Sequence, residues 1–157
     1  MESREIKPVV LLVDDEPEVI EGLKRGLHKL PFKLLWAYSG REAMEILAEN
    51  PVNVLVADEQ MPEMSGSELL SFARKAHPNV IRIMLTGHAS VTSAMNAIYE
   101  GWVYQYLHKP CSAMDLASAV YNGLLLQSIQ TQEEGPHVVM SASEQDELLD
   151  HVSKSST

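Results

Sequence analysis

Acidic side chains follow two short apolar runs of this 157-residue chain, and a threonine and a lysine follow two later ones. The first pair is Asp14–Asp15, after Val9–Val13, and the third carboxylate is Asp58, after Val54–Ala57. An Asp after a strand is often only a turn residue or a helix cap, so none of these residues indicates a site by itself. Together, three carboxylates could hold a hard cation, and one of them could act as a nucleophile.

The elements that must position these side chains alternate between short apolar strands and amphipathic helices. Strands are predicted at Val9–Val13, Lys33–Ala37, Val54–Asp58, Val80–Leu85 and Tyr104–Leu107. Helices are predicted from Pro17 to Leu30, from Ser39 to Asn50, from Gly66 to His77, from Val91 to Glu100 and from Ser112 to about Gln127. Such alternation with short loops predicts an α/β fold, a doubly wound sheet of five parallel strands with five helices on its two faces.

The order of the strands determines whether the polar residues meet. In a flavodoxin-like order, 2-1-3-4-5, the first and third strands are neighbours, and their carboxyl ends share one crevice. Asp14, Asp15 and Asp58 would then converge and repel one another unless a cation neutralises them, which favours Mg²⁺. Thr86 and Lys109 would reach the same edge, where a hydroxyl and a positive charge could hold the oxygens of a phosphoryl group on Asp58.

Composition narrows the class of partner. The formal charge of −10 and pI near 5.0 disfavour direct binding of nucleic acid. The chain contains neither a Gly-x-Gly-x-x-Gly motif nor a Walker-type loop, so nucleotide-binding versions of this fold lose support. Its single cysteine, Cys111, cannot form an internal disulfide, and no apolar run approaches the length of a membrane span. A cytoplasmic protein with no membrane anchor is the expectation.

The same residues resemble the receiver domain of bacterial two-component response regulators, over roughly residues 7 to 127. The features that carry the resemblance come in the same order along the chain: Asp14–Asp15, Asp58 followed by Met61–Pro62 and Gly66, Thr86–Gly87, Tyr106, and Lys109–Pro110. The sequences around Asp58, around Thr86 and from Glu100 to Leu107 are also similar to those of receivers that precede cyclic-dinucleotide phosphohydrolase or other signalling output domains.

The resemblance implies a role for each site residue. Asp58 would accept a phosphoryl group from a histidine kinase or a phosphotransfer protein. Asp15, Asp58 and the main-chain carbonyl of Gln60 would bind Mg²⁺, with Asp14 helping directly or through water. Lys109 would pair with the phosphoryl group, Thr86 would hydrogen-bond it, and Tyr106 would swing inward as Thr86 moves. The bond between Lys109 and Pro110 would be cis. Glu59, Gln60 and His88 occupy positions that influence how fast the phosphoryl group is lost.

The expected output is a change in binding of a downstream protein or a tethered output domain, without turnover of a metabolite. Residues 128–157 are expected to be an acidic tail or linker, disordered in part or forming one short helix between Ser141 and Val152. Two rivals stay open on the sequence. A phosphoaspartate hydrolase related to haloacid dehalogenases would carry Asp-x-Asp after the first strand, and a scaffold independent of phosphorylation would not need all five site residues.

Overall fold

The computed structural model describes residues 7–87 and 103–134, with side chains up to residue 129. The chain divides into two compact units, Met1–Leu124 and Leu125–Thr157, and the sheet lies in the first. The described elements, in chain order, are β1 Val9–Val13, α1 Pro17–Leu27, β2 Lys33–Ala37, α2 Gly40–Glu49, β3 Val54–Asp58, α3 Gly66–Ala76, β4 Ile81–Thr86, β5 Gln105–His108 and α5 Ala113–Glu134.

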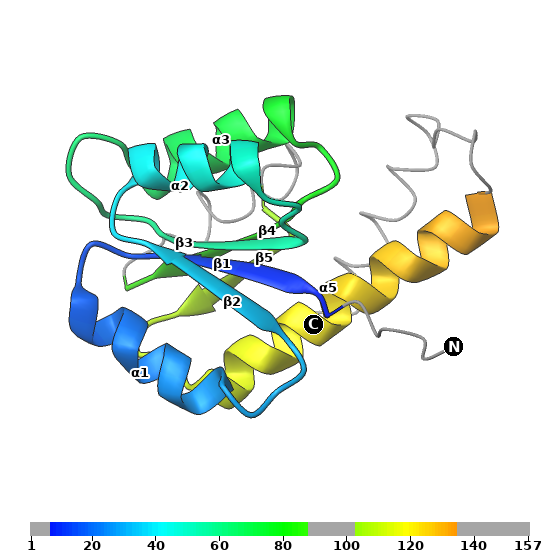
Figure 1. Ribbon diagram of the computed structural model, residues 1–157, viewed down its shortest axis with the longest axis horizontal. Helices are drawn as coiled ribbons and strands as arrows, with labels where there is room; N and C mark the ends of the chain where they lie inside the picture. The colour runs from blue at the N-terminus through cyan, green and yellow to red at the C-terminus, as the bar shows by residue number, and fades with distance from the viewer. Residues whose placement is uncertain (1–6, 88–102, 135–157) are drawn as a thin grey trace. The chain divides into compact units, whose positions relative to one another are not determined.

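The five strands form one parallel sheet in the order β2-β1-β3-β4-β5, which confirms the predicted doubly wound topology (Figure 1). The two strands that end in carboxylates, β1 and β3, are neighbours and are buried along their whole length. Val13 pairs with Ala57, so the residues that follow them, Asp14 and Asp58, leave the sheet side by side. Asp58 in turn pairs with Leu85 of β4, which brings Thr86 to the same edge.

The sheet is buried on both faces because its strands alternate side chains between two hydrophobic cores. Leu11 and Val13 of β1 pack into the core shared with α2 and α3. Val10 and Leu12 pack into the other core, shared with α1 and the start of α5. Figure 1 shows α2 and α3 on one side of the sheet and α1 on the other. Because both faces of the sheet are buried, the apolar runs of β1 and β3 are not interrupted by polar residues at every second position.

Short polar side chains set the starts of three helices. The hydroxyls of Ser39, Ser65 and Ser112 each accept the backbone N–H three residues further on, at 3.1, 3.1 and 3.0 Å. These contacts satisfy N–H groups that have no partner inside the helix. Pro17 occupies the first turn of α1, where its missing N–H is not needed. Ser39 and Ser112, at which the sequence placed the starts of two helices, are therefore the capping residues of α2 and α5.

The last helix is longer than the sequence pattern predicted. We expected it to end near Gln127 and expected a tail or linker from residue 128 onward, whereas α5 continues to Glu134. No Gly or Pro stands between Gly123 and Gly135, and the Gln and Glu residues of this stretch favour helix. Polarity alone was a poor reason to end the helix.

Smaller differences concern element ends. The structure places β4 and β5 one residue later than predicted, and α1 ends at Leu27 instead of Leu30. The predicted helices at residues 91–100 and 141–152, and His88, lie outside the described residues. None of the helices described here combines the length and the hydrophobicity that crossing a bilayer requires.

Candidate functional site

The two carboxylates that follow β1, those of Asp14 and Asp15, lie in different surroundings. Asp14 is almost fully buried, with 1% of its surface exposed, and its backbone N–H donates to the carbonyl of Ala37 at 3.2 Å. Its side chain accepts the backbone N–H of Glu16 at 2.9 Å, which fixes the turn that leads into α1. Asp15 is only half-buried. The site therefore has one interior carboxylate and one that water can reach.

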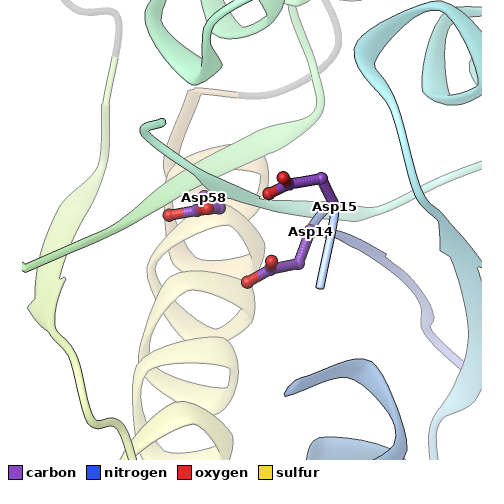
Figure 2. Close-up of side chains that lie close together, drawn as sticks. All are labelled: Asp14, Asp15 and Asp58. Atoms are coloured by element: carbon purple, nitrogen blue, oxygen red, sulfur yellow. The ribbon is translucent and has the colours of Figure 1, made fainter. Parts of the chain in front are cut away.

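Asp58 completes an acidic cluster at this edge of the sheet. It is 6% exposed, and the backbone of Gln60 hydrogen-bonds its side chain. One carboxylate oxygen from each of Asp14, Asp15 and Asp58 lies within 4.8 Å of the others. Figure 2 shows the three side chains gathered where β1 and β3 end. Oxygen donors at this spacing are the ligand set that a hard divalent cation takes.

Lys109 places a positive charge against two of these carboxylates. Its Nζ lies 2.8 Å from Oδ2 of Asp14 and 3.2 Å from Oδ1 of Asp58. The loop that carries it is held by a hydrogen bond from its backbone N–H to the carbonyl of Thr86 at 2.9 Å. The bond between Lys109 and Pro110 is cis, as expected from the resemblance. Lys109 thus acts as an internal counter-ion at the acidic edge.

The pKa values of Asp58 and Lys109 are both raised, for different reasons. Burial, followed by the charge of Asp14, raises the pKa of Asp58 above its ordinary value of 3.8, although Lys109 and the Gln60 backbone act in the opposite direction. Burial by itself would lower the pKa of Lys109, but the hydrogen bonds and charges of Asp14 and Asp58 outweigh it and raise that pKa. Two carboxylates therefore compete for one cation, and negative charge remains in excess.

Thr86 and Tyr106 lie beside the cluster, on the face of the sheet that α2 and α3 cover. Met84 pairs with Tyr106 across β4 and β5, and Thr86 is two residues beyond Met84, so all three side chains project from one face. Thr86 is 1% exposed, and its hydroxyl donates to the carboxylate of Glu59. Tyr106 is partly buried against the core, and burial, then the charge of Glu59, raises its pKa.

Glu59 is the residue whose contacts sequence reasoning did not predict. We expected it only to influence the lifetime of a phosphoryl group, whereas the structure makes it a hydrogen-bond partner of Thr86. The nearest signal in the sequence is a second acidic residue directly after Asp58. That signal says nothing about which neighbour the side chain reaches, since the partner is 27 residues away along the chain.

Gly66 is required by the close approach of two backbones at the start of α3. Its N–H donates to the carbonyl of Glu59 at 2.9 Å, and a Cβ at this position would lie 2.3 Å from the carbonyl oxygen of Asp58. Backbone atoms at that distance cannot yield as the end of a flexible side chain would. A side chain at residue 66 would therefore displace the loop that carries Asp58.

Replacing Gly66 with alanine is expected to destabilise the protein by about 2–4 kcal/mol, because the added methyl overpacks against backbone. Gly22 provides a matched control, since a Cβ there would meet nothing within 4 Å. In the middle of α1, Gly22→Ala should be neutral or stabilise by up to about 1 kcal/mol. Urea unfolding of both variants measures the difference, and equal free energies of unfolding would contradict the steric argument.

Comparisons with known proteins agree with this arrangement. A model of the response regulator receiver domain matches residues 10–121. The chain belongs to this family. The receiver is 32% identical over 121 residues to the hydrogenase transcriptional regulatory protein HoxA of Cupriavidus necator, a match that covers 77% of this chain and 25% of HoxA. It is also 39% identical over 113 residues to the sensor kinase CckA of Brucella abortus, covering 71% of this chain and 12% of CckA.

Solved structures of receivers show the same fold. The signal receiver domain of an HD domain-containing protein from Pseudomonas fluorescens Pf-5 superposes with a TM-score of 0.73 at 32% identity, covering 78% of this chain and 98% of that one. A response regulator receiver domain from Clostridium thermocellum gives a TM-score of 0.72 at 32% identity, with the same coverage. The chain spans only about a quarter of the length of HoxA, so the match concerns one part of that regulator.

Proposed function

We propose that Asp58 is the phosphoacceptor of this receiver. One of its carboxylate oxygens attacks the phosphorus of a phosphohistidine, the new O–P bond forms, and the P–N bond breaks as the departing imidazole nitrogen gains a proton. The observation that carries the proposal is that the three acidic side chains and Lys109 converge at one edge of the sheet. In its ionised form Asp58 offers a nucleophile already paired with a cation.

We propose Mg²⁺ as the cofactor of this reaction, held by Asp14, Asp15, Asp58 and the main-chain carbonyl of Gln60. The donor set fits, because hard oxygen ligands lie within 4.8 Å of one another and Lys109 alone leaves the cluster negative. When bound, the ion supplies positive charge where phosphoryl oxygens accumulate negative charge.

The remaining site residues are proposed to bind and sense the phosphoryl group. Lys109, already 3.2 Å from Asp58, would pair with a phosphoryl oxygen. Thr86 would donate its hydroxyl to another oxygen, and Tyr106 would move on the same face of the sheet as Thr86 turns. Phosphorylation thereby shifts the equilibrium between two states of that face. The chain would catalyse only its own phosphorylation and dephosphorylation.

The partners we propose are a histidine kinase or phosphotransfer protein upstream, and a downstream protein or tethered output domain. A cleft of about 520 Å³ borders the site and is lined by Lys109, Pro110, Leu85 and residues of α1, among them Val19 and Leu23. Its position beside Lys109 suits the approach of a phosphodonor. The excess of acidic residues favours a protein partner over nucleic acid, and we expect the cytoplasm as the location.

We propose that the receiver domain occupies residues 7–127 and that residues 128–157 are an acidic tail or linker. The family match to residues 10–121 and the compact unit that ends at Leu124 support this division. The linker would then begin in helical form, since α5 reaches Glu134. The several transcriptional regulators and the HD domain-containing protein among the relatives favour an output domain of a longer regulator.

Incubating the full chain with acetyl phosphate tests the proposed function. With Mg²⁺, intact mass should increase by one phosphoryl group, and with EDTA in place of Mg²⁺ it should stay unchanged, because the excess carboxylate charge repels the donor. No mass increase under any condition would contradict the phosphoacceptor. Continuous hydrolysis of a generic phosphomonoester would instead support the rival hydrolase.

A further inference from the structure

Glu59 is fixed by its backbone on both sides. Its N–H donates to the carbonyl of Leu85 at 3.0 Å, which ties it to β4, and its carbonyl accepts the N–H of Gly66 at 2.9 Å, which ties it to α3. Only its side chain is left to move. That side chain is half-buried and accepts the hydroxyl of Thr86.

A threonine hydroxyl has a single proton and can donate to one acceptor at a time. In the structure the acceptor is the Glu59 carboxylate, whereas the proposed function needs the same proton for a phosphoryl oxygen on Asp58. The backbone of Thr86 is held by the N–H of Lys109 at 2.9 Å, so the competition is between two acceptors for one positioned donor. The two hydrogen bonds exclude each other.

The charge on Glu59 gives phosphorylation a means to break the first bond. A phosphoryl group carries about 1.5 to 2 negative charges and replaces the single charge of the Asp58 carboxylate, so phosphorylation adds about one negative charge one residue away from Glu59. Like charges at this separation repel, and the partly buried setting weakens the screening by water. The Glu59 side chain is the movable part, so repulsion turns it outward and lets the hydroxyl of Thr86 donate to another acceptor.

We propose that Glu59 is a positioning residue that holds Thr86 in the resting receiver, and that phosphorylation must displace it before Thr86 can switch. This inference rests on the proposed function and adds a restraint to it. Glu59 sets the balance between the resting and switched states through the hydroxyl of Thr86. Removing its carboxylate therefore makes the switched state easier to reach.

Beryllofluoride, which mimics a phosphoryl group without covalent chemistry, provides the test. Titration of the full chain in excess Mg²⁺, followed by fluorine NMR, should show that Glu59→Ala binds the probe roughly tenfold more tightly than wild type, the size expected for one hydrogen bond to a charged group. Glu45→Ala is the matched control: it removes one negative charge from an exposed position on α2 and should leave the affinity unchanged.

A double-mutant cycle separates the hydrogen bond from simple charge repulsion. In a Thr86→Ala background the gain from Glu59→Ala should fall to less than about twofold, because the donor that Glu59 restrains is absent. An equal gain in both backgrounds would overturn the inference. Absence of beryllofluoride binding by the wild type would instead contradict the proposed function. If Glu59→Ala does not fold, Glu59→Leu, which also removes the acceptor and the charge but keeps more of the side-chain volume, takes its place in the cycle.

A second measurement needs neither metal nor probe. In metal-free protein the methyl resonance of Thr86 should shift in Glu59→Ala, because the hydroxyl on the same side chain loses its acceptor. Glu45→Ala should leave that resonance where it is in the wild type. An unchanged Thr86 resonance in Glu59→Ala would contradict the restraint.

Discussion

The Asp58→Asn variant is expected to gain no phosphoryl group from acetyl phosphate and Mg²⁺, while the wild type gains one. An amide is a poor nucleophile, and it also replaces one of the three carboxylates proposed to hold the ion. Asp14 and Asp15 would remain, yet neither occupies the end of β3. Intact mass followed by peptide mapping measures the result. A variant that is phosphorylated as fully as the wild type would show that another residue is the acceptor.

The same variant is expected to change how stability depends on pH. The folded-state pKa of Asp58 is raised, mainly by burial and then by Asp14, so the folded protein binds a proton more tightly than the unfolded chain. Its contribution to stability is therefore fully present below the ordinary value of 3.8 and is lost as pH rises through the folded pKa. Above that window, in EDTA, Asp58→Asn should be more stable than wild type, by on the order of 1 kcal/mol.

Urea unfolding at a series of pH values in EDTA measures this dependence. Asp15→Asn is a suitable control, because Asp15 is another carboxylate of the cluster but is less buried than Asp58. The difference between wild type and Asp58→Asn should grow as pH rises and then level off. A difference that does not vary with pH would contradict a raised pKa.

Replacing Lys109 with methionine is expected to destabilise the metal-free protein by about 2–3 kcal/mol, because it removes the cation that faces two buried carboxylates. Water cannot take over the role of that cation, because the Asp14 carboxylate is only 1% exposed. Adding Mg²⁺ should restore more stability to Lys109→Met than it gives the wild type, since one cation then replaces another. Urea unfolding with EDTA and with Mg²⁺ measures both increments.

Two further variants make the Lys109 result specific. Lys75→Met removes an exposed cation from α3 and should leave stability within about 0.5 kcal/mol of wild type. Asp14→Asn added to Lys109→Met should recover part of the loss, because the uncompensated buried charge is then gone. A Lys109→Met protein as stable as wild type, with the same response to Mg²⁺, would show that Lys109 does not neutralise the site.

The charges and hydrogen bonds of the site are coupled to one another. At rest, Lys109 and hydrogen bonds neutralise part of an acidic cluster, and Glu59 holds the hydroxyl of Thr86. Adding a phosphoryl group to Asp58 would redistribute both interactions at once. Lys109 would gain a more highly charged partner, and Glu59 would be repelled from the donor it holds. Chemistry at one carboxylate is thereby felt on the face of the sheet that carries Thr86 and Tyr106.

Local patterns in the sequence were sufficient to predict the fold. The buried runs of β1 and β3, the serine caps before α2 and α5, and the breaks at Pro and Gly each depend on neighbours a few positions apart, which the chain displays directly. Once the strand order was taken as 2-1-3-4-5, the convergence of Asp14, Asp15 and Asp58 followed from topology. The end of α5 was missed because polar residues without Gly or Pro suit a helix as well as a linker.

Only the tertiary structure determined which side chains contact one another within the site. The sequence could bring Lys109 to the acidic edge, but the contact of its Nζ with both Asp14 and Asp58 depends on the loop after β5. Likewise, the bond between Glu59 and Thr86 joins residues on two strand ends, and the close packing of Gly66 against Asp58 joins two loops. Side-chain partners of this kind depend on packing in three dimensions, whereas strands, caps and their order depend on patterns along the chain.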